Sequence, residues 1–320
     1  MVIVGGGPAG MAAALSAAEA GGKSILLLER APFLGGILNQ CIHTGFGLEY
    51  FGKVLTGPEY AQFFIDRIGV NRQIEVSCRS FVVDLTSNKE LTYLKPNGVE
   101  TVRAKALIMA TGCREKTREM IPISGTRPAG IFPAGLAQQL INMEGMMPGK
   151  EVVIIGSGDI GLIMARRFTL EGARVKAVIE IESTTKGLTR NVVQCLHDFD
   201  IPLYFNHKVK KIFGKDRVEK VRVMRVNADF SELPESAFDI ECDTVLISVG
   251  LIPENELIEM AGVKIDRKTN TPVSSELNLT SIPGLFVCGN SYKVYDLVDK
   301  VTQDSEKAGQ MAAEYLLKNK

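Results

Sequence analysis

Apolar runs and a glycine-rich turn alternate at the start of the chain in the order of a strand, a turn, a helix and a second strand. The apolar run Val2–Val4 leads into a glycine-rich turn at residues 5–10, and an alanine-rich helical stretch follows over residues 11–20. The next apolar run, Ile25–Leu28, ends in Glu29. This order predicts a βαβ unit whose glycine turn joins the first strand to the helix.

The same order returns 151 residues later. The run Glu151–Ile155 enters a glycine turn at residues 156–161, a helical stretch follows to residue 171, and the run 175–179 ends in Glu180. Four positions of the first unit have counterparts at this single offset: Gly5, Gly7, Gly10 and Glu29 match Gly156, Gly158, Gly161 and Glu180. The match predicts two nucleotide-binding βαβ units, produced by duplication or by convergence.

Outside these units, most of the hydrophobic pattern changes to the shorter period of strands. Strands are expected at residues 79–85, 90–94, 105–110, 208–227, 238–249 and 281–289, and a last helix at 301–317. The chain is therefore predicted to be α/β, with two Rossmann-like three-layer domains, the second inserted in the first. The expected boundaries are 1–117 plus 248–320 for the first domain and 118–247 for the second.

Composition narrows the possible functions. Of 320 residues, 45% are hydrophobic and 23% charged, which is typical of a globular protein with sizeable cores. Lys and Arg total 37, as do Asp and Glu, so net charge offers no case for binding nucleic acid or an anionic membrane. No apolar run reaches the length of a membrane-spanning helix, and the apolar N-terminus lacks the basic region of a signal peptide.

The six cysteines and three histidines bear on metals and on redox compartment. No cysteine pair forms a CxxC motif, and the spacing of cysteines and histidines does not match a zinc site, so no metal site is expected. Scattered single cysteines without an export signal predict a reducing, cytoplasmic setting.

The two glycine turns have the GxGxxG spacing of dinucleotide-binding loops. The first glycine permits the tight turn, the second lets a pyrophosphate approach the backbone, and the third lets the helix pack on the strand. Glu29 and Glu180 each lie 19 positions after the third glycine, where an acid accepts the ribose hydroxyls. A turn that only joins strand to helix is the alternative, but two copies with both acids favour dinucleotide binding.

Glu180 also favours NAD over NADP. A carboxylate at the ribose position hydrogen-bonds a free 2′-hydroxyl and repels a 2′-phosphate, which NADP sites usually pair with Arg. Residues 180–185 offer two acids and three hydroxyl side chains, and Lys186 is the one base next to them. The alternative is that Glu180 points to solvent and decides nothing.

Motif order along nearly the whole chain resembles the pyridine-nucleotide-disulfide oxidoreductase superfamily, with the size and domain order of thioredoxin reductases. The resemblance rests on the first glycine motif, on Ala110-Thr111-Gly112, on residues 284–290 and on the nested second motif. It implies that the first domain binds FAD and the second binds NAD. The implied FAD contacts are Gly5, Gly7, Pro8, Ala9, Gly10, Glu29, Arg30, Gly36, Ile37, His43, Val83, Ala110, Thr111, Gly112, Gly289, Asn290 and Val301. The implied NAD contacts are Gly156, Ser157, Gly158, Asp159, Ile160, Gly161, Glu180 and Gly250.

The resemblance also assigns roles to parts of the first domain. Gly36 and its neighbours would approach the flavin, Val83 the adenine, and Gly289 with Asn290 the ribityl chain. Val301, taken as the start of the last helix, would bring the helix dipole towards the flavin pyrimidine.

Two departures from the family matter. The family usually has Asp where Asn290 stands, and an amide can still bond a ribityl hydroxyl. The redox dithiol is missing: residues 130–136 contain no cysteine, and Cys41 is followed five positions later by Phe46 rather than by a second cysteine. A dithiol exchange needs two thiols, so disulfide reductase activity is not expected.

Cys41 and His43 leave two interpretations open. They lie in a loop expected to pass near the flavin, where a single thiol activated by histidine could serve peroxide or oxygen reduction. The other interpretation, which we favour, is a small packed residue, because a free cysteine is often simply buried.

Residues 35–38, 110–115 and 130–138 are similar to a dithiol-less branch of the superfamily. That branch contains the FAD/NAD subunits of glycerol-3-phosphate, opine and proline dehydrogenases and of hydrogen cyanide synthase. The resemblance implies electron transfer between NAD(H) and flavin, beside a small iron–sulfur protein and a second flavoprotein dehydrogenase subunit. The alternatives are a stand-alone NADH oxidase or peroxidase using Cys41, and a flavoprotein subunit without catalytic activity.

Overall fold

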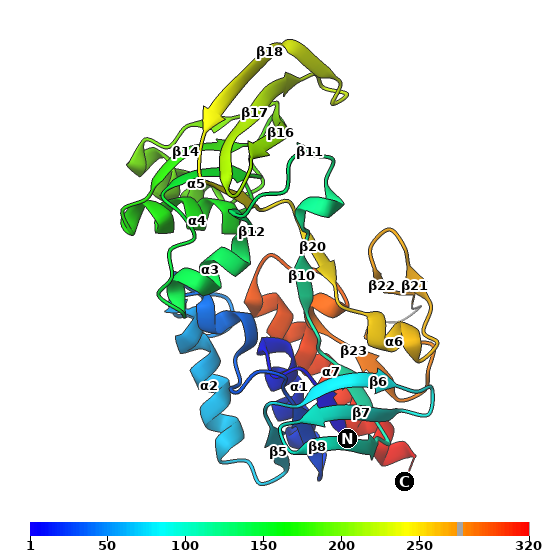
Figure 1. The fold of residues 1–320 in the computed structure, drawn as a ribbon. Coiled ribbons are helices and arrows are strands. Elements are labelled where there is room, and N and C mark those ends of the chain that lie inside the picture. Colours follow the sequence, from blue (N-terminus) through cyan, green and yellow to red (C-terminus); the bar gives the residue numbers. More distant parts are fainter. Residues whose placement is uncertain (274–277, 320) are drawn as a thin grey trace. The chain divides into compact units, whose positions relative to one another are not determined.

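The computed structural model describes residues 1–273 and 278–319 and divides into two compact units (Figure 1). Unit 1 comprises Met1–Arg114 with Ile252–Lys320, and unit 2 comprises Glu115–Leu251. The chain passes between them through β10 (Cys113–Glu115) and β20 (Leu251–Pro253), two short strands that pair with each other.

Unit 1 is built on a five-stranded parallel sheet of order β23-β9-β1-β2-β5. Its strands are β1 (Val2–Val4), β2 (Ile25–Leu28), β5 (Ile74–Ser77), β9 (Leu107–Met109) and β23 (Leu285–Val287). Its helices are α1 (Pro8–Glu19), α2 (Gly57–Gly69), α6 (Glu256–Met260) and α7 (Val298–Lys318), with the 3-10 turns η1 (Gly36–Gln40) and η4 (Gly289–Ser291). The remaining strands are β3 (Thr44–Phe46), β4 (Leu55–Thr56), β6 (Phe81–Leu85), β7 (Glu90–Lys95), β8 (Gly98–Arg103), β21 (Ile265–Asp266) and β22 (Thr271–Pro272).

Three layers follow from the alternation of side chains along the central strands of unit 1. Ile3 and Ile108 face a core shared with α1, α2 and α7, whereas Val4 and Met109 face a core shared with the meander β6-β7-β8 and with α6. Figure 1 shows α1 and α7 on one face of this sheet and the meander on the other. Strands buried on both faces are uniformly apolar, which is why the sequence shows them as continuous apolar runs.

Unit 2 repeats this plan. Its parallel sheet has the order β12-β19-β13-β14-β15, and an antiparallel sheet of order β16-β17-β18, with β11 at its edge, packs on one face. The strands are β11 (Ser124–Gly125), β12 (Ile131–Pro133), β13 (Glu151–Ile155), β14 (Arg174–Ile179), β15 (Leu203–Tyr204), β16 (His207–Gly214), β17 (Val218–Val226), β18 (Glu232–Glu241) and β19 (Thr244–Ile247). The helices α3 (Ala134–Asn142), α4 (Asp159–Leu170) and α5 (Thr189–Cys195) pack on the other face.

Some predicted boundaries shift. The first helix begins at Pro8, inside the glycine motif, and the last begins at Val298 rather than Val301. The helices α2 and α5 are not among those predicted from the sequence. A capping box marks the start of α2: Thr56 and Glu59 bond each other's backbone N–H, and this S/T-x-x-E signal is present in the sequence.

Candidate dinucleotide-binding sites

The first glycine loop in unit 1 has the steric requirements that its motif predicts. Gly5 has a φ of +107°, and a Cβ there would overlap the carbonyl oxygen of Ala110. A Cβ at Gly10 would overlap the carbonyl oxygen of Gly5. At Gly7 a Cβ would meet only Gly36, at 3.9 Å, so the second glycine faces open space. The first and third glycines are therefore required by packing, and the second leaves room for a ligand.

That open space lies at the N-terminus of α1. Gly7 is the N-cap residue, Pro8 is the first helical residue, no side chain caps the helix, and its first turn holds no acid. The unpaired N–H groups and the helix dipole favour a phosphate at this position. Gly36 approaches the same place, because a Cβ on it would lie 2.9 Å from the Gly7 Cα. These residues fit the pyrophosphate of a dinucleotide.

Glu29 is held beside the loop by backbone donors. Its side chain is buried, Oε2 accepts a hydrogen bond from the Gly6 N–H at 2.6 Å, and Oε1 accepts one from Ala31 at 2.7 Å. A carboxylate has about four acceptor positions, so it can still bind ribose hydroxyls. The contributions of Gly6 and Ala31 were not predicted, because a backbone donor has no residue signature.

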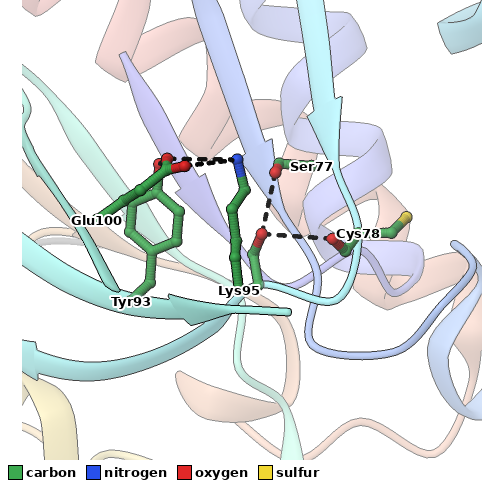
Figure 2. Close-up of polar contacts among 6 residues, drawn as sticks. Ser77, Cys78, Tyr93, Lys95 and Glu100 are labelled. Atoms are coloured by element: carbon green, nitrogen blue, oxygen red, sulfur yellow. Dashed lines mark hydrogen bonds and ion pairs between the residues drawn. The ribbon is translucent and has the colours of Figure 1, made fainter. Parts of the chain in front are cut away.

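The turn after β5 hydrogen-bonds the backbone of the segment that carries Glu29. The Ser80 N–H donates to the Glu29 carbonyl at 2.8 Å, and the Arg79 N–H donates to Ala31 at 2.9 Å. The hydroxyls of Ser77 and Ser80 are 2.9 Å apart, and the Ser80 hydroxyl also bonds the Cys78 carbonyl. Figure 2 labels Ser77 and Cys78 of this turn. This network fixes the turn between the parallel sheet and the meander.

The meander has its own polar cluster and a β-bulge. The Tyr93 hydroxyl donates to Glu100 at 2.6 Å, and Lys95 pairs with the same carboxylate at 3.2 Å (Figure 2). The pairing of β6 with β7 shifts between Val82 and Asp84, which leaves Val83 as the extra residue with a partly exposed side chain. Backbone groups at a bulge are unpaired in the ladder and available to a ligand. Val83 therefore fits its predicted contact with an adenine.

The predicted ribityl-binding residues lie close to the end of β9. The Asn290 amide donates to the Cys113 sulfur at 3.6 Å, and its oxygen accepts from the Tyr295 N–H at 3.1 Å. The Gly289 N–H donates to Asp304 at 2.9 Å. Asp304 is buried and was not predicted, since an acid inside a helical stretch resembles a solvated face.

Ala110, Thr111 and Gly112 join the same region to β20. The Thr111 hydroxyl donates to the Glu254 carbonyl at 2.6 Å, and Gly112 has a φ of +73° with no atom near a Cβ position. Arg30, also predicted to contact FAD, is exposed and lies 3.8 Å from Glu254.

The position of Val301 requires a correction. Because α7 begins at Val298, Val301 is the fourth residue of the helix, and its side chain is buried. The first turn instead holds Asp299, whose buried carboxylate accepts from the N–H groups of Gly47 at 3.2 Å and Tyr50 at 2.8 Å. The loop after β3 is thereby attached to the start of α7.

The surroundings of Cys41 favour a thiol over a thiolate. Its side chain is 5% exposed, and its sulfur donates to the Ile37 carbonyl at 3.3 Å. Burial raises the pKa of the Cys41 thiol to about 12. His43 bonds the Thr44 carbonyl through Nδ1 at 3.1 Å and contacts the Phe46 ring, whereas Ile37 is exposed.

The second glycine loop, in unit 2, repeats the first. Gly156 has a φ of +95°, and a Cβ there would overlap the Ser248 carbonyl oxygen, whereas a Cβ at Gly161 would lie 2.7 Å from the Gly156 oxygen. No atom lies near a Cβ position at Gly158, which is the N-cap residue of α4 and has no side-chain cap. The steric pattern of the first loop, with an open second glycine, is thus present again.

Glu180 also repeats the geometry of Glu29. It is buried, Oε2 accepts from the Ser157 N–H at 2.9 Å and hydroxyl at 2.5 Å, and Oε1 accepts from the Glu182 N–H at 2.9 Å. The interpretation in which Glu180 points to solvent is therefore wrong. Lys186 is paired with Glu182 at 3.6 Å.

Three further predicted NAD contacts lie around this loop. The Asp159 carboxylate accepts from the Leu188 N–H at 2.8 Å and the Asn191 amide at 2.6 Å, which ties the segment after β14 to the start of α4. Ile160 is half-buried in the same turn, and Gly250 has a φ of +121° at the end of unit 2.

Neither a metal cluster nor a spanning helix is found in the described part of the chain. Within residues 1–273 and 278–319, no group of three or more His, Cys, Asp or Glu side chains could hold a metal ion. Among the helices of these residues, none has the length and apolar character needed to cross a membrane.

Known proteins match this chain over most of its length. The family model for pyridine nucleotide-disulphide oxidoreductases matches residues 1–308. The HcnB subunit of hydrogen cyanide synthase from Pseudomonas protegens is 29% identical over 82% of this chain and 59% of its own length. An opine oxidase subunit of Rhizobium meliloti is 25% identical over 98% of this chain and 61% of its own. The chain thus spans about six-tenths of both proteins.

A solved structure gives the same picture of the fold. Thioredoxin reductase of T. acidophilum superposes with a TM-score of 0.77 at 25% identity, covering 100% of this chain and 98% of that one. The matches confirm the predicted superfamily, the α/β Rossmann-type fold and the cofactors FAD and NAD(P). They do not test individual site residues, which stay predictions.

Proposed function

Because the chain belongs to the pyridine nucleotide-disulphide oxidoreductase family, we propose that it transfers electrons between NAD(H) and bound FAD as one subunit of a larger dehydrogenase. Unit 1 is the proposed FAD domain and unit 2 the proposed NAD domain. That the chain is a FAD- and NAD(P)-dependent oxidoreductase follows from the family; the preference for NAD and the subunit role are the proposal.

One observation carries the proposal: the same constellation of glycine loop and buried acid occurs once in each unit. Each loop has an open second glycine at an uncapped helix N-terminus. Each acid, Glu29 or Glu180, accepts two backbone N–H bonds from residues at matching positions. Two dinucleotides, bound one to each unit, suit a flavoprotein that exchanges electrons with a nicotinamide.

When bound, FAD supplies a ring that exchanges a hydride with nicotinamide, so this step needs no acid or base from the protein. The residues of the chain have positioning roles. The open loops at Gly7 and Gly158 would hold the pyrophosphates, and Glu29 and Glu180 would hold the riboses. Asn290 would bond the ribityl chain with its amide, in the place where the family usually has a carboxylate.

Electron transfer through a redox dithiol is not part of the proposal. All six cysteines, each within the described residues, are thiols, and residues 130–136 contain no cysteine. Disulfide reduction, the activity in the name of the thioredoxin reductase match, is therefore outside the proposal. The thiols also support our proposal of a reducing, cytoplasmic location.

The subunit role draws support from the names of two relatives. HcnB and the opine oxidase relative are each named as subunits, and the chain matches about six-tenths of their length. We therefore propose a second flavoprotein dehydrogenase and a small iron–sulfur protein as partners that carry electrons to or from an organic substrate.

The alternative of a stand-alone oxidase or peroxidase using Cys41 is disfavoured. Such a thiol must ionise near neutral pH, whereas burial raises the pKa of Cys41 to about 12. A non-catalytic flavoprotein is the remaining alternative, and anaerobic titration distinguishes it from the proposal.

The test is anaerobic mixing of the FAD-loaded chain with NADH or NADPH, followed by absorbance at the flavin band. The expected result is bleaching by NADH that is faster than bleaching by NADPH. Retention of oxidised flavin with both nucleotides would contradict the catalytic role, whereas equal rates would contradict only the NAD preference. Affinity purification from the native host tests the subunit role, which requires co-purifying proteins.

A further inference from the structure

The two glycine loops differ at the residue between the first and second glycines, which is Gly6 in unit 1 and Ser157 in unit 2. We propose that Ser157 is a positioning residue for nucleotide selectivity: its hydroxyl holds the Glu180 carboxylate in the orientation that accepts a free ribose 2′-hydroxyl and excludes a 2′-phosphate. This inference rests on the proposed function, because it takes unit 2 as the nicotinamide site.

Glu29 and Glu180 share two donors and differ in a third. In unit 1, Glu29 accepts bonds from the backbone N–H groups of Gly6 and Ala31, and from no side chain among the residues that the structure describes. Glu180 accepts the equivalent pair from Ser157 and Glu182, both at 2.9 Å. The Ser157 hydroxyl adds a bond of 2.5 Å to Oε2, the oxygen that already accepts the Ser157 N–H. The second acid is therefore more firmly oriented than the first.

The first unit has no room for this third donor. A Cβ on Gly6 would lie 2.5 Å from Cδ2 of Leu34 and 2.9 Å from the Cβ of Glu29. The hydroxyl is thus a feature of unit 2 rather than a general requirement of the loop, since the first loop keeps the same backbone bonds without it.

Ser157 is itself held in place by the segment that follows β14. Its side chain is fully buried, and its carbonyl oxygen accepts bonds from the Thr185 hydroxyl at 2.9 Å and the Gly187 N–H at 3.0 Å. Water cannot replace a hydroxyl lost at a site without solvent access, so removal of this donor leaves the carboxylate less restrained.

The orientation of the Glu180 carboxylate affects nucleotide selectivity through its charge. An ionised carboxylate at the ribose edge attracts a 2′-hydroxyl and repels a 2′-phosphate, and both effects depend on its distance and orientation. The nearby cation Lys186 is paired with Glu182 rather than directed to Glu180. Selectivity in this unit therefore depends on Glu180 and on the group that orients it.

The test compares binding of NAD⁺ and NADP⁺ to the FAD-loaded chain by titration calorimetry. The wild type is expected to bind NAD⁺ more tightly, so the Kd for NADP⁺ divided by the Kd for NAD⁺ is greater than one. Ser157→Ala should lower this ratio about tenfold, the effect of losing one hydrogen bond to a charged group. The matched control is Thr169→Val, which removes a half-buried hydroxyl that donates to the Ala165 carbonyl within α4, outside the hydrogen bonds of Ser157 and Glu180. It should leave the ratio within about twofold.

A double variant makes the test specific. With Glu180→Gln already present, Ser157→Ala should change the ratio by less than about twofold, because the two residues act through one interaction. If Ser157→Ala does not fold, Ser157→Gly, which copies the first loop, is measured in its place. An unchanged ratio in a variant that still binds NAD⁺ overturns this inference alone. A wild type that binds neither nucleotide overturns the proposed function with it.

Discussion

The second glycine of each loop and the acid that follows the second strand have different physical duties. Gly7 and Gly158 leave open space beside the backbone. The nearest atom to a Cβ placed on Gly7 lies 3.9 Å away, and none lies within 4 Å of a Cβ placed on Gly158. Glu29 and Glu180 are hydrogen-bond acceptors: each is buried, and each accepts a backbone N–H of its own loop. In the proposed sites the glycine would admit the ligand, and the acid would orient it.

Gly7→Val is expected to abolish FAD binding while the chain stays folded. The valine side chain would occupy the open space at the N-terminus of α1, where the pyrophosphate is proposed to bind. The measurement is release of flavin by denaturation, followed by chromatography of the released cofactor. Gly69→Val, at an exposed position where a Cβ meets no atom, is the control and should keep one FAD per chain. Retained FAD in Gly7→Val, or FMN in the wild type, would contradict the assignment.

Cys41→Ser is expected to leave the reduction of bound flavin by NADH within about twofold of the wild-type rate, because hydride transfer requires no thiol. The thiol is buried and its pKa is raised to about 12, so the wild-type rate should show no thiol titration between about pH 7 and 9. Stopped-flow absorbance measures both. Loss of reduction with FAD still bound would support a redox role for Cys41.

The strand before each nucleotide-binding helix determines where the N-terminus of that helix lies. Both α1 and α4 follow a central strand of a parallel sheet after a turn of only a few residues, so each helix N-terminus lies at the carboxyl edge of its sheet. Neither helix has a side-chain cap. The helix α2, which belongs to no nucleotide motif, is instead closed by its own capping box.

Thr56→Ala is expected to lower the free energy of unfolding by about 1 kcal/mol through loss of the α2 cap. The Thr56 hydroxyl accepts from the Glu59 N–H, and Glu59 accepts from the Thr56 N–H at 2.7 Å. Urea denaturation measures the loss. Thr56→Ser keeps an acceptor at the N-cap and should cost much less; an equal loss in both variants would attribute the effect to packing of the threonine methyl.

Cys242→Ala should reduce the loss of stability at alkaline pH. The thiol is buried in the core between the two sheets of unit 2, and burial raises its pKa to about 12 from an ordinary value of 9. Between these values the unfolded chain loses a proton that the folded chain keeps. The free energy of unfolding therefore falls with rising pH by about 1.4 kcal/mol per unit from this group.

The variant lacks this contribution, so its urea-derived stability should fall less steeply than that of the wild type between about pH 9 and 11. Between about pH 7 and 8 the two should differ by a constant amount, because the thiol is protonated in both states. Parallel curves throughout the alkaline range would show that the pKa of Cys242 is the same in the folded and unfolded protein and would contradict the prediction.

At the scale of the whole molecule, the two proposed dinucleotide sites supply one end of the electron path, NAD(H), and leave the other end to be supplied. The chain has the size and order of a two-domain oxidoreductase, and it covers about six-tenths of relatives that are named as subunits. The proposed partner, which would hold the organic substrate, would supply that other end.

The isolated chain is expected to oxidise NADH slowly with oxygen and faster with artificial electron acceptors. It should not oxidise glycerol 3-phosphate, proline or an opine without a partner. Steady-state assays with each acceptor and substrate check this, with the complex purified from the host as the positive control. Robust oxidation of any of these substrates by the single chain would overturn the subunit role.

The sequence alone determined the general plan of the molecule. Continuous apolar runs bounded by glycine turns predict parallel strands buried on both faces, and the offset shared by the two glycine motifs predicts the repeated units. The family, the fold and the cofactors followed from these motifs and are confirmed. Such features are local, since a motif of a few residues carries its own steric requirement.

Only the tertiary structure decided which groups meet. The backbone bonds of Gly6 and Ala31 to Glu29, the attachment of Asp304 to Gly289, and the contact of Ser157 with Glu180 join positions 2 to 23 residues apart. Backbone N–H groups are the same in every residue except proline, so no residue type reveals which of them faces an acid. A buried Asp likewise looks like a surface charge until the fold surrounds it. The physical reason is that hydrogen bonding and burial depend on distances that chain folding sets, whereas the pattern along the sequence records only which side chains prefer to leave water.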